Sequence, residues 1–433
     1  MPLIIPANTL SGGYEVANSC RFNDGDSASL TKSVSGTSQT TAGTISFWFK
    51  RGVLSTDQRV WINYVDANNY GAIKLQSDNK MEVVVVDGGS VTGKLVTNRL
   101  FRDCSAWYHC CVAINSSDGT AGNRMRLYIN GTEETSFATD TNPSSGATME
   151  FFTDGTNKIG QMNSDQYFDG YISEFVMIHG SQLTPSSFGE FDSDSPTVWK
   201  PKNVSGLSFG SKDYYLDFED SGDLGDDESG QGNDFTENNL AAIDQASDSP
   251  TNNFATLNSL IDKGITYSEG NLQYKNTHGS NSEYTHPTIQ EVSNGRWYWE
   301  IKMASTNNNS AYEYFGNGTA YVKSNGDIHP SGTTTVSNGD IFGFYLNYED
   351  GQMTIHRNGS QVYQSSSGIS LSTTTAQIAA FNNTEYQLNF GNPIFSISSG
   401  NADANGYGNF EYSPVLSGVN FYSLCTKNLA EYG

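Results

Sequence analysis

The chain has 433 residues, of which 47 are acidic and 23 are basic, so its formal net charge is −24. This excess of negative charge repels nucleic-acid phosphates, and we therefore expect no binding of DNA or RNA. The length exceeds that of one ordinary domain. The 44 glycines, 24 tyrosines and 23 phenylalanines favour strands and turns over helices or disorder.

The cysteines and the apolar stretches indicate in which cellular compartment the protein is made and whether it enters a membrane. Five cysteines occur, an odd number whose spacing fits no zinc site, and we expect free thiols in a protein made in a reducing compartment. The first residues lack the basic and apolar regions of a signal peptide. No apolar stretch reaches the length of a membrane span, so we expect no membrane insertion.

Short alternating strands separated by turn residues fill the first half, residues 1–191. Residues 44–50 alternate in the way that a half-buried strand requires. Residues 125–129 form another such strand and are followed by Asn130-Gly131, which suits the two positive-φ positions of a type I′ turn. The pair predicts a hairpin whose return strand runs from Thr132 to Phe137. Further strands are expected at 81–86, 112–114 and 168–178.

Several motifs of this half resemble, in their order, the laminin G-like, concanavalin-type jelly roll. They are Arg21-Phe-Asn-Asp-Gly-Asp26, Thr44-Ile-Ser-Phe-Trp-Phe-Lys50, Trp107-Tyr-His109, Leu127-Tyr-Ile-Asn-Gly131, Lys158-Ile-Gly160 and Phe168-Asp-Gly-Tyr-Ile172. Modules of that family bind sugars or proteins, and some hold a calcium ion at the rim of the sandwich. The resemblance thus implies Asp24 and Asp26 as candidate calcium ligands. Calcium takes six or more oxygens, however, and Asn23 to Asp26 is equally a turn, which we expect instead. No other cofactor is expected.

Residues 192–257 differ in composition from both neighbours. No Lys or Arg occurs between Lys212 and Lys263, while acidic residues crowd a stretch rich in glycine and serine. This composition predicts a solvated, loop-rich connector with one short strand from Tyr214 to Phe218.

Alternation returns in the second half, residues 258–433, at 297–303, 342–348 and 386–390. A second Asn-Gly pair, Asn358-Gly359, follows the strand 353–357 and predicts a hairpin with the return strand Ser360 to Gln364. The motifs Gly295-Arg-Trp-Tyr-Trp-Glu-Ile301, Gly339-Asp-Ile-Phe-Gly-Phe344 and Asn389-Phe-Gly391 resemble the SPRY domain, another concanavalin-type sandwich. We therefore predict an all-β fold of two tandem antiparallel β-sandwiches, of concanavalin or jelly-roll type, joined by the acidic connector.

The search for chemistry yields two incomplete motifs. Residues 88–94 have the glycine and lysine spacing of a phosphate loop, but Leu95 replaces the hydroxyl that would hold magnesium. Residues 206–210 spell a nucleophile elbow around Ser208, yet a strand rather than a helix is expected behind it. Concanavalin-type hydrolases carry paired carboxylates on one strand, and no stretch of this sequence resembles that strand. We expect no enzyme activity.

The loop 306–314 is the better candidate for binding. Asn308, Asn309, Tyr312 and Tyr314 offer the amides and aromatic faces that proteins use against sugars or partner proteins. The alternative is that Tyr312 and Tyr314 lie on a strand and pack inward.

Residues 229–235 and 249–257 resemble connector phrases of virion proteins from tailed bacteriophages. The resemblance implies a structural protein on the exterior of a phage particle, such as a tail fibre, capsid fibre or decoration protein. We expect it in the virion, after assembly in the host cytoplasm, with other virion proteins, further copies of itself and a host surface glycan as partners. Two alternatives are a free lectin-like glycan-binding module and a polysaccharide-degrading enzyme of concanavalin-type fold.

Overall fold

A computed structural model describes residues 13–38, 40–261, 265–276, 283–289, 294–305, 314–317, 319–371, 377–380, 384–414 and 420–432. The described chain divides into two compact units. The first unit holds residues 13–245 and 249–251, and the second holds 246–248 and 252–432. Every strand pair that joins named strands is antiparallel among the described residues, and the only α-helix among them is α1 (Thr426–Tyr432). The all-β prediction is confirmed.

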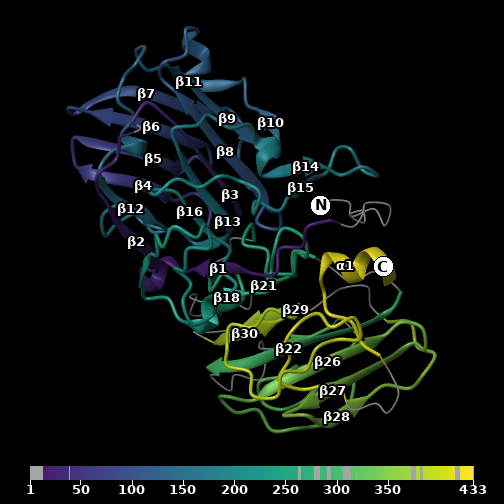
Figure 1. Ribbon diagram of the computed structural model, residues 1–433. Helices are drawn as coiled ribbons and strands as arrows, with labels where there is room; N and C mark the ends of the chain where they lie inside the picture. Colours follow the sequence, from purple (N-terminus) through teal and green to yellow (C-terminus); the bar gives the residue numbers. More distant parts are fainter. Residues whose placement is uncertain are drawn as a thin grey trace. The chain divides into compact units, whose positions relative to one another are not determined.

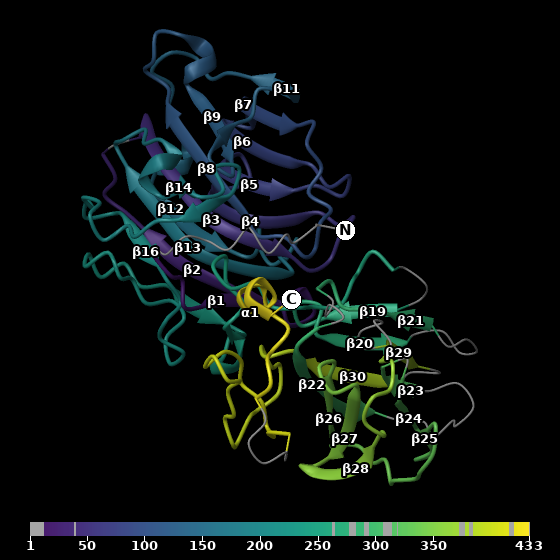
Figure 2. The ribbon, with the colours of Figure 1, turned by 90° about the vertical axis from the view of Figure 1, so that its right-hand side faces the viewer.

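Two eight-stranded sheets form the first unit and lie as facing layers (Figures 1 and 2). The first sheet has the order β10-β9-β8-β3-β13-β1-β18, with β16 paired to β13. Its strands are β1 (Ser19–Phe22), β3 (Ala42–Arg51), β8 (Tyr108–Asn115), β9 (Met125–Ile129), β10 (Thr132–Glu133), β13 (Gly170–His179), β16 (Tyr214–Leu216) and β18 (Gln245–Ala246).

The second sheet has the order β11-β7-β6-β5-β4-β12-β2-β17. Its strands are β2 (Ser29–Val34), β4 (Gln58–Asp66), β5 (Asn69–Leu75), β6 (Met81–Asp87), β7 (Ser90–Thr97), β11 (Phe137–Thr141), β12 (Gly155–Ile159) and β17 (Thr236–Asn238). Short 3-10 helices lie in the loops: η2 (Asp24–Asp26), η3 (Ala121–Asn123), η4 (Glu150–Phe152), η5 (Pro185–Ser187) and η6 (Ala242–Asp244). The glycine-rich 88–94 stretch makes the β6–β7 hairpin, as expected.

The core of the first unit lies between these sheets. Ile45, Phe47 and Phe49 of β3 face inward and are fully buried, so the strand predicted from their alternation is confirmed. Trp48 faces the other way and is buried as well, with its ring 5.0 Å from that of His109. The outer face of the first sheet is therefore covered here too.

The stretch expected to begin a separate connector folds onto the first unit instead. β16 pairs with β13, and β17 pairs with β2, so residues 192–245 belong to the sandwich. The physical reason is that Tyr214, Leu216 and Phe235 bury their side chains in the core, which stabilises this stretch against its acidic loops. The short strand predicted from Tyr214 is confirmed over 214–216.

Two further sheets form the second unit, with orders β19-β20-β30-β22-β26-β27-β28 and β21-β29-β23-β24-β25. Their strands are β19 (Ile265–Ser268), β20 (Gln273–Asn276), β21 (Glu283–Thr285), β22 (Arg296–Ser305), β23 (Tyr314–Gly316), β24 (Tyr321–Lys323), β25 (Ile328–His329), β26 (Ile341–Asn347), β27 (Gln352–Arg357), β28 (Ser360–Gln364), β29 (Gln377–Ala380) and β30 (Glu385–Asn389). Trp297, Trp299, Ile301 and Met303 point into one core, as their alternation predicts.

Both Asn-Gly pairs make the predicted turns. The φ angles are 50° and 74° at Asn130 and Gly131, and 48° and 77° at Asn358 and Gly359. β28 has the predicted bounds. β10 is shorter than the predicted return strand, because the chain leaves it after Glu133 and crosses to pair with β7 in the other sheet.

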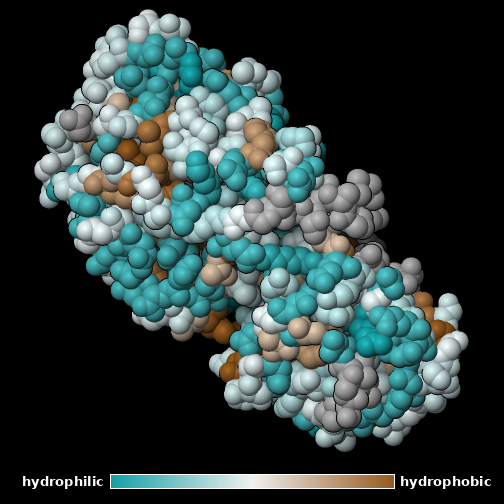
Figure 3. All heavy atoms as spheres, turned by 45° about the vertical axis from the view of Figure 1, so that its right-hand side comes forward, coloured by the Kyte–Doolittle hydropathy of each residue, from teal (hydrophilic) through white to brown (hydrophobic). Residues whose placement is uncertain are grey.

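The surface and the thiols agree with the composition. In the view of Figure 3, hydrophobic atoms form separate patches among hydrophilic ones. All five cysteines are buried free thiols. None of the helices that the structure describes has the length and apolar character needed to cross a membrane.

Candidate functional site

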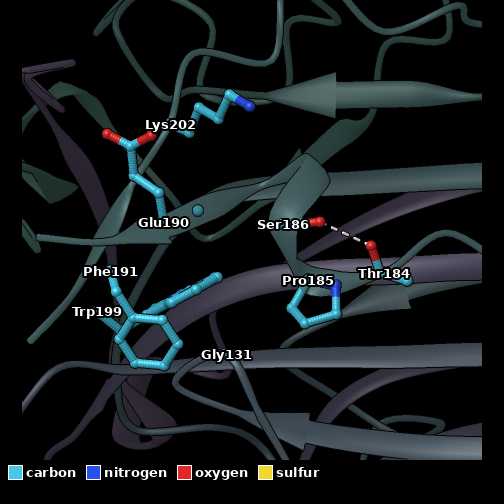
Figure 4. Close-up of a pocket in the computed structure, with 9 residues that line it drawn as sticks. Gly131, Thr184, Pro185, Ser186, Glu190, Phe191, Trp199 and Lys202 are labelled. Atoms are coloured by element: carbon cyan, nitrogen blue, oxygen red, sulfur yellow. Dashed lines mark hydrogen bonds between the residues drawn. The ribbon is translucent and has the colours of Figure 1, made fainter. Parts of the chain in front are cut away.

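A hollow on the first unit gathers aromatic, hydroxyl and charged side chains (Figure 4). It encloses about 350 Å³, near the lower end of the ~300–1,000 Å³ typical of ligand pockets. We call it the Trp199 hollow. Its lining residues are Gly131, Thr184, Pro185, Ser186, Gly189, Glu190, Phe191, Trp199 and Lys202.

The hairpin of β14 (Gly189–Phe191) and β15 (Trp199–Pro201) supplies the aromatic side of the hollow. Phe191 and Trp199 are opposite each other in this antiparallel pair, and their rings meet edge to face with centroids 4.9 Å apart. Phe191 is 46% exposed and is the one aromatic residue among the large hydrophobic residues that are exposed in the described part of the chain. An exposed ring held in place by its neighbour suits it for contact with a ligand.

The Trp199 ring packs against the Asn-Gly turn between β9 and β10. A Cβ at Gly131 would overlap the indole ring, and one at Gly189 would lie 2.6 Å from it. The indole therefore needs a residue without a side chain at both positions. Beneath it lies His109 of β8, with ring centroids 5.8 Å apart.

His109 packs against Trp199 and lies outside the lining of the hollow. It is fully buried, and this burial lowers its pKa to about 3, so the ring is neutral at neutral pH. A hydrogen bond of 2.8 Å joins its Nε2 to Ser46 Oγ, and its backbone N–H donates to Asn130 Oδ1 at 2.7 Å. The ring lies under Trp199, so this Ser–His pair does not line the hollow.

Polar groups line the remaining sides (Figure 4). Thr184 Oγ1 and Ser186 Oγ at η5 are 2.8 Å apart and share one hydrogen bond. Glu190 and Lys202 lie on a further side of the hollow. Lys200 of β15 is buried and places its Nζ 3.7 Å from Glu190 Oε1 and 3.2 Å from Asp192 Oδ2.

The two candidate calcium ligands that the resemblance implies lie in the turn formed by η2. Asp24 and Asp26 form the exposed η2, where Asn23 Nδ2 donates to Asp26 Oδ2 at 2.8 Å and Asn23 Oδ1 accepts the Gly25 N–H. Across the described ranges, no group of three or more His, Cys, Asp and Glu residues is placed to hold a metal ion. The arrangement is that of the expected turn.

The predicted binding loop falls largely beyond what the structure describes. Asn308, Asn309 and Tyr312 lie outside the described residues. Tyr314 contributes its backbone to β23, which pairs with β24 and β29, and its side chain also lies outside the description. The Trp199 hollow was missed by the sequence reasoning. The signal was a Phe and a Trp flanking a turn in a stretch interpreted as connector.

Two buried glutamates, one in each unit, are the other notable titratable groups. Glu174 lies at a bulge of β13 with φ 50°, and Tyr215 Oη donates to its Oε2 at 2.9 Å. Glu300 accepts the Tyr412 N–H at 2.7 Å and the Glu411 N–H at 3.0 Å. Burial raises the pKa of Glu174 to about 8 and that of Glu300 to about 7. Their oxygens are engaged by protein donors, so we assign both a structural role.

Residues 22–187 match the model of the Concanavalin A-like lectin/glucanases superfamily and form a concanavalin-like, laminin G-like domain. No curated protein matches the chain. Solved structures to which the chain is similar include the native heptameric SAP-like pentraxin of Limulus polyphemus, with 17% identity over 40% of this chain and 76% of that chain and a TM-score of 0.28.

Two others are domains LG4-5 of the mouse laminin α1 chain and a candidate carbohydrate-binding protein of Bacteroides ovatus. The laminin domains have 10% identity over 95% of this chain and 88% of that chain, with a TM-score of 0.32. The Bacteroides protein has 15% identity over 53% of this chain and 60% of that chain, with a TM-score of 0.37. The SPRY-like character of the second half stays a prediction.

Proposed function

We propose that this chain is a glycan-binding structural protein of a bacteriophage exterior, without catalytic activity of its own. The observation that carries the proposal is the Phe191–Trp199 pair in the Trp199 hollow. Sugars present apolar C–H faces that stack on aromatic rings, while their hydroxyls bond to polar side chains around those rings. Gly131 and residues 184–186 of the lining belong to the stretch that matches the concanavalin A-like lectin family, and the other five lining residues follow it in the chain.

The acidic groups of the hollow favour binding over hydrolysis. Glycoside hydrolysis uses two carboxyl groups about 5–9.5 Å apart across the scissile bond. Glu190 is the one carboxylate that lines the hollow. The Ser46–His109 pair lies beneath Trp199 and does not line it. A non-catalytic role is therefore the one that the lining supports.

The placement on a phage particle has a separate basis. It is supported by the resemblance of residues 229–235 and 249–257 to virion connectors and by the pair of tandem sandwiches. Tail fibre, capsid fibre and decoration protein are the positions that fit, with other virion proteins and further copies of the chain as partners. Mass spectrometry of purified particles tests this part: the chain should be present in stoichiometric amounts, and its absence from particles would contradict it.

A glycan array with the full chain tests the binding part. We expect retention of a defined set of glycans and no release of sugar from them over long incubation. An array without any retained glycan would overturn the binding function, and release of sugar would favour the hydrolase alternative.

A further inference from the structure

We infer that the Trp199 hollow binds an uncharged pyranose residue and that this binding requires no divalent cation. The inference rests on the proposed glycan binding and adds the chemistry of the sugar.

The size and shape of the hollow favour a single sugar ring. Its volume of about 350 Å³ is small for a ligand pocket. Phe191 stands exposed at one side, and the hydroxyls of Thr184 and Ser186 lie across from it (Figure 4). One ring can stack on Phe191 while its hydroxyls reach the opposite side.

The charges of the hollow disfavour an acidic sugar. Lys200 already compensates Asp192 and Glu190 through contacts of 3.2 and 3.7 Å. Lys202 is then the one cation in the lining, and no arginine is present there to bind a carboxylate or sulfate through two parallel bonds. An acidic sugar would also bring its own negative charge beside Glu190.

The same groups suit a neutral sugar. The mutual bond of 2.8 Å between the Thr184 and Ser186 hydroxyls uses one of their two hydrogens, so one hydroxyl can still donate to a sugar and both oxygens can still accept. Hydroxyl-rich, uncharged rings fulfil these demands without burying an unpaired charge.

The lining cannot supply a calcium site. Calcium takes six to eight oxygen ligands, usually including several carboxylates. Glu190 is the one carboxylate in the lining, and Lys200 lies 3.7 Å from it. Sugar hydroxyls must therefore bind to the protein directly, and not through a bridging cation.

The experiment compares matched neutral and acidic glycans on the full chain, once with calcium and once with EDTA. The best ligand is then titrated by calorimetry against Phe191→Ala and against Leu100→Ala, a control in which an exposed aliphatic residue of the same unit is removed. We expect neutral glycans to be preferred, equal affinity in both buffers, about tenfold weaker binding by Phe191→Ala and unchanged binding by Leu100→Ala.

The outcomes separate the inference from the function beneath it. Preference for acidic glycans, loss of binding in EDTA, or full affinity of Phe191→Ala would overturn the inference while glycan binding stands. No binding to any glycan would overturn both. Circular dichroism of the variants excludes misfolding as the cause of a loss.

Discussion

The two Asn-Gly turns share a local structure and differ in their surroundings. In each, the asparagine exchanges two bonds with one residue of the neighbouring strand. Asn130 N–H donates to His109 O at 2.9 Å, and its Oδ1 accepts the His109 N–H. Asn358 does the same with Ile341, at 2.8 and 2.9 Å. The sequence pair therefore specifies the whole turn, including its bond to the next strand.

The glycines of these turns show where the two units diverge. The ring of Trp199 lies over Gly131, and the ring of Tyr412 lies over Gly359. The Trp199 ring belongs to the β14–β15 hairpin, contacts the exposed Phe191 and lines the Trp199 hollow. The Tyr412 ring belongs to a segment that Glu300 holds against its sheet. The same turn thus supports a candidate site in one unit and a closed packing contact in the other.

The largest effect is expected when Gly131 is replaced by alanine. The new methyl group overlaps the Trp199 ring at a positive φ of 74°, so the unfolding free energy of the first unit should fall by about 4 kcal/mol. Glycan binding should be lost as well. Chemical denaturation and calorimetric titration measure the two effects.

Two control variants separate the causes of that loss. Gly88→Ala has a positive φ but open space around it, so it should cost about 1–2 kcal/mol from strain alone. Gly189→Ala crowds Trp199 from the other side and has no positive φ. If Gly131→Ala lowers the unfolding free energy no more than Gly88→Ala does, the Trp199 ring does not crowd Gly131.

The buried Glu300 predicts a pH dependence of the second unit. Its pKa rises from 4.5 to about 7, so between these values the folded state holds a proton that the unfolded state has lost. The unfolding free energy therefore falls as pH rises through this window, by about 3 kcal/mol in total. Glu300→Gln should remove this slope. Hydrogen exchange along the chain, followed from about pH 5 to about pH 8, measures this pH dependence.

The matched variant lies in the first unit. Burial raises the pKa of Glu174 to about 8, and Glu174→Gln should flatten the pH dependence of the first unit while that of the second is kept. A slope in the second unit that Glu300→Gln leaves unchanged would show that other groups cause it.

The asparagines of the two turns should differ by a smaller amount. Asn358 also donates from Nδ2 to Asp340 Oδ1 at 2.8 Å. Alanine is strained at the positive φ of both positions. Beyond this shared strain, Asn358→Ala should lower the unfolding free energy by about 2 kcal/mol and Asn130→Ala by about 1 kcal/mol. Denaturation midpoints of both variants test this order, and equal costs would mean that the bond to Asp340 adds nothing.

Replacing Phe191 by alanine should have the smallest effect on stability. Nearly half of the side chain is exposed, at 46%, so the unfolding free energy should change by less than about 0.5 kcal/mol. A loss of several kcal/mol in a thermal melt would show that Phe191 is part of the core and is not free to contact a ligand.

The sequence by itself determined the strands and the turns. The alternation at 44–50 and 297–303 and the positive-φ tolerance of both Asn-Gly pairs depend on neighbouring residues, so local patterns are sufficient to predict them. Only the tertiary structure decided that residues 192–245 complete the first sandwich and that β10 ends early. It also decided that Trp199 and Phe191 meet Gly131 and Pro185 in one hollow. Such contacts join residues far apart in the chain, and they depend on which apolar surfaces fit each other after folding.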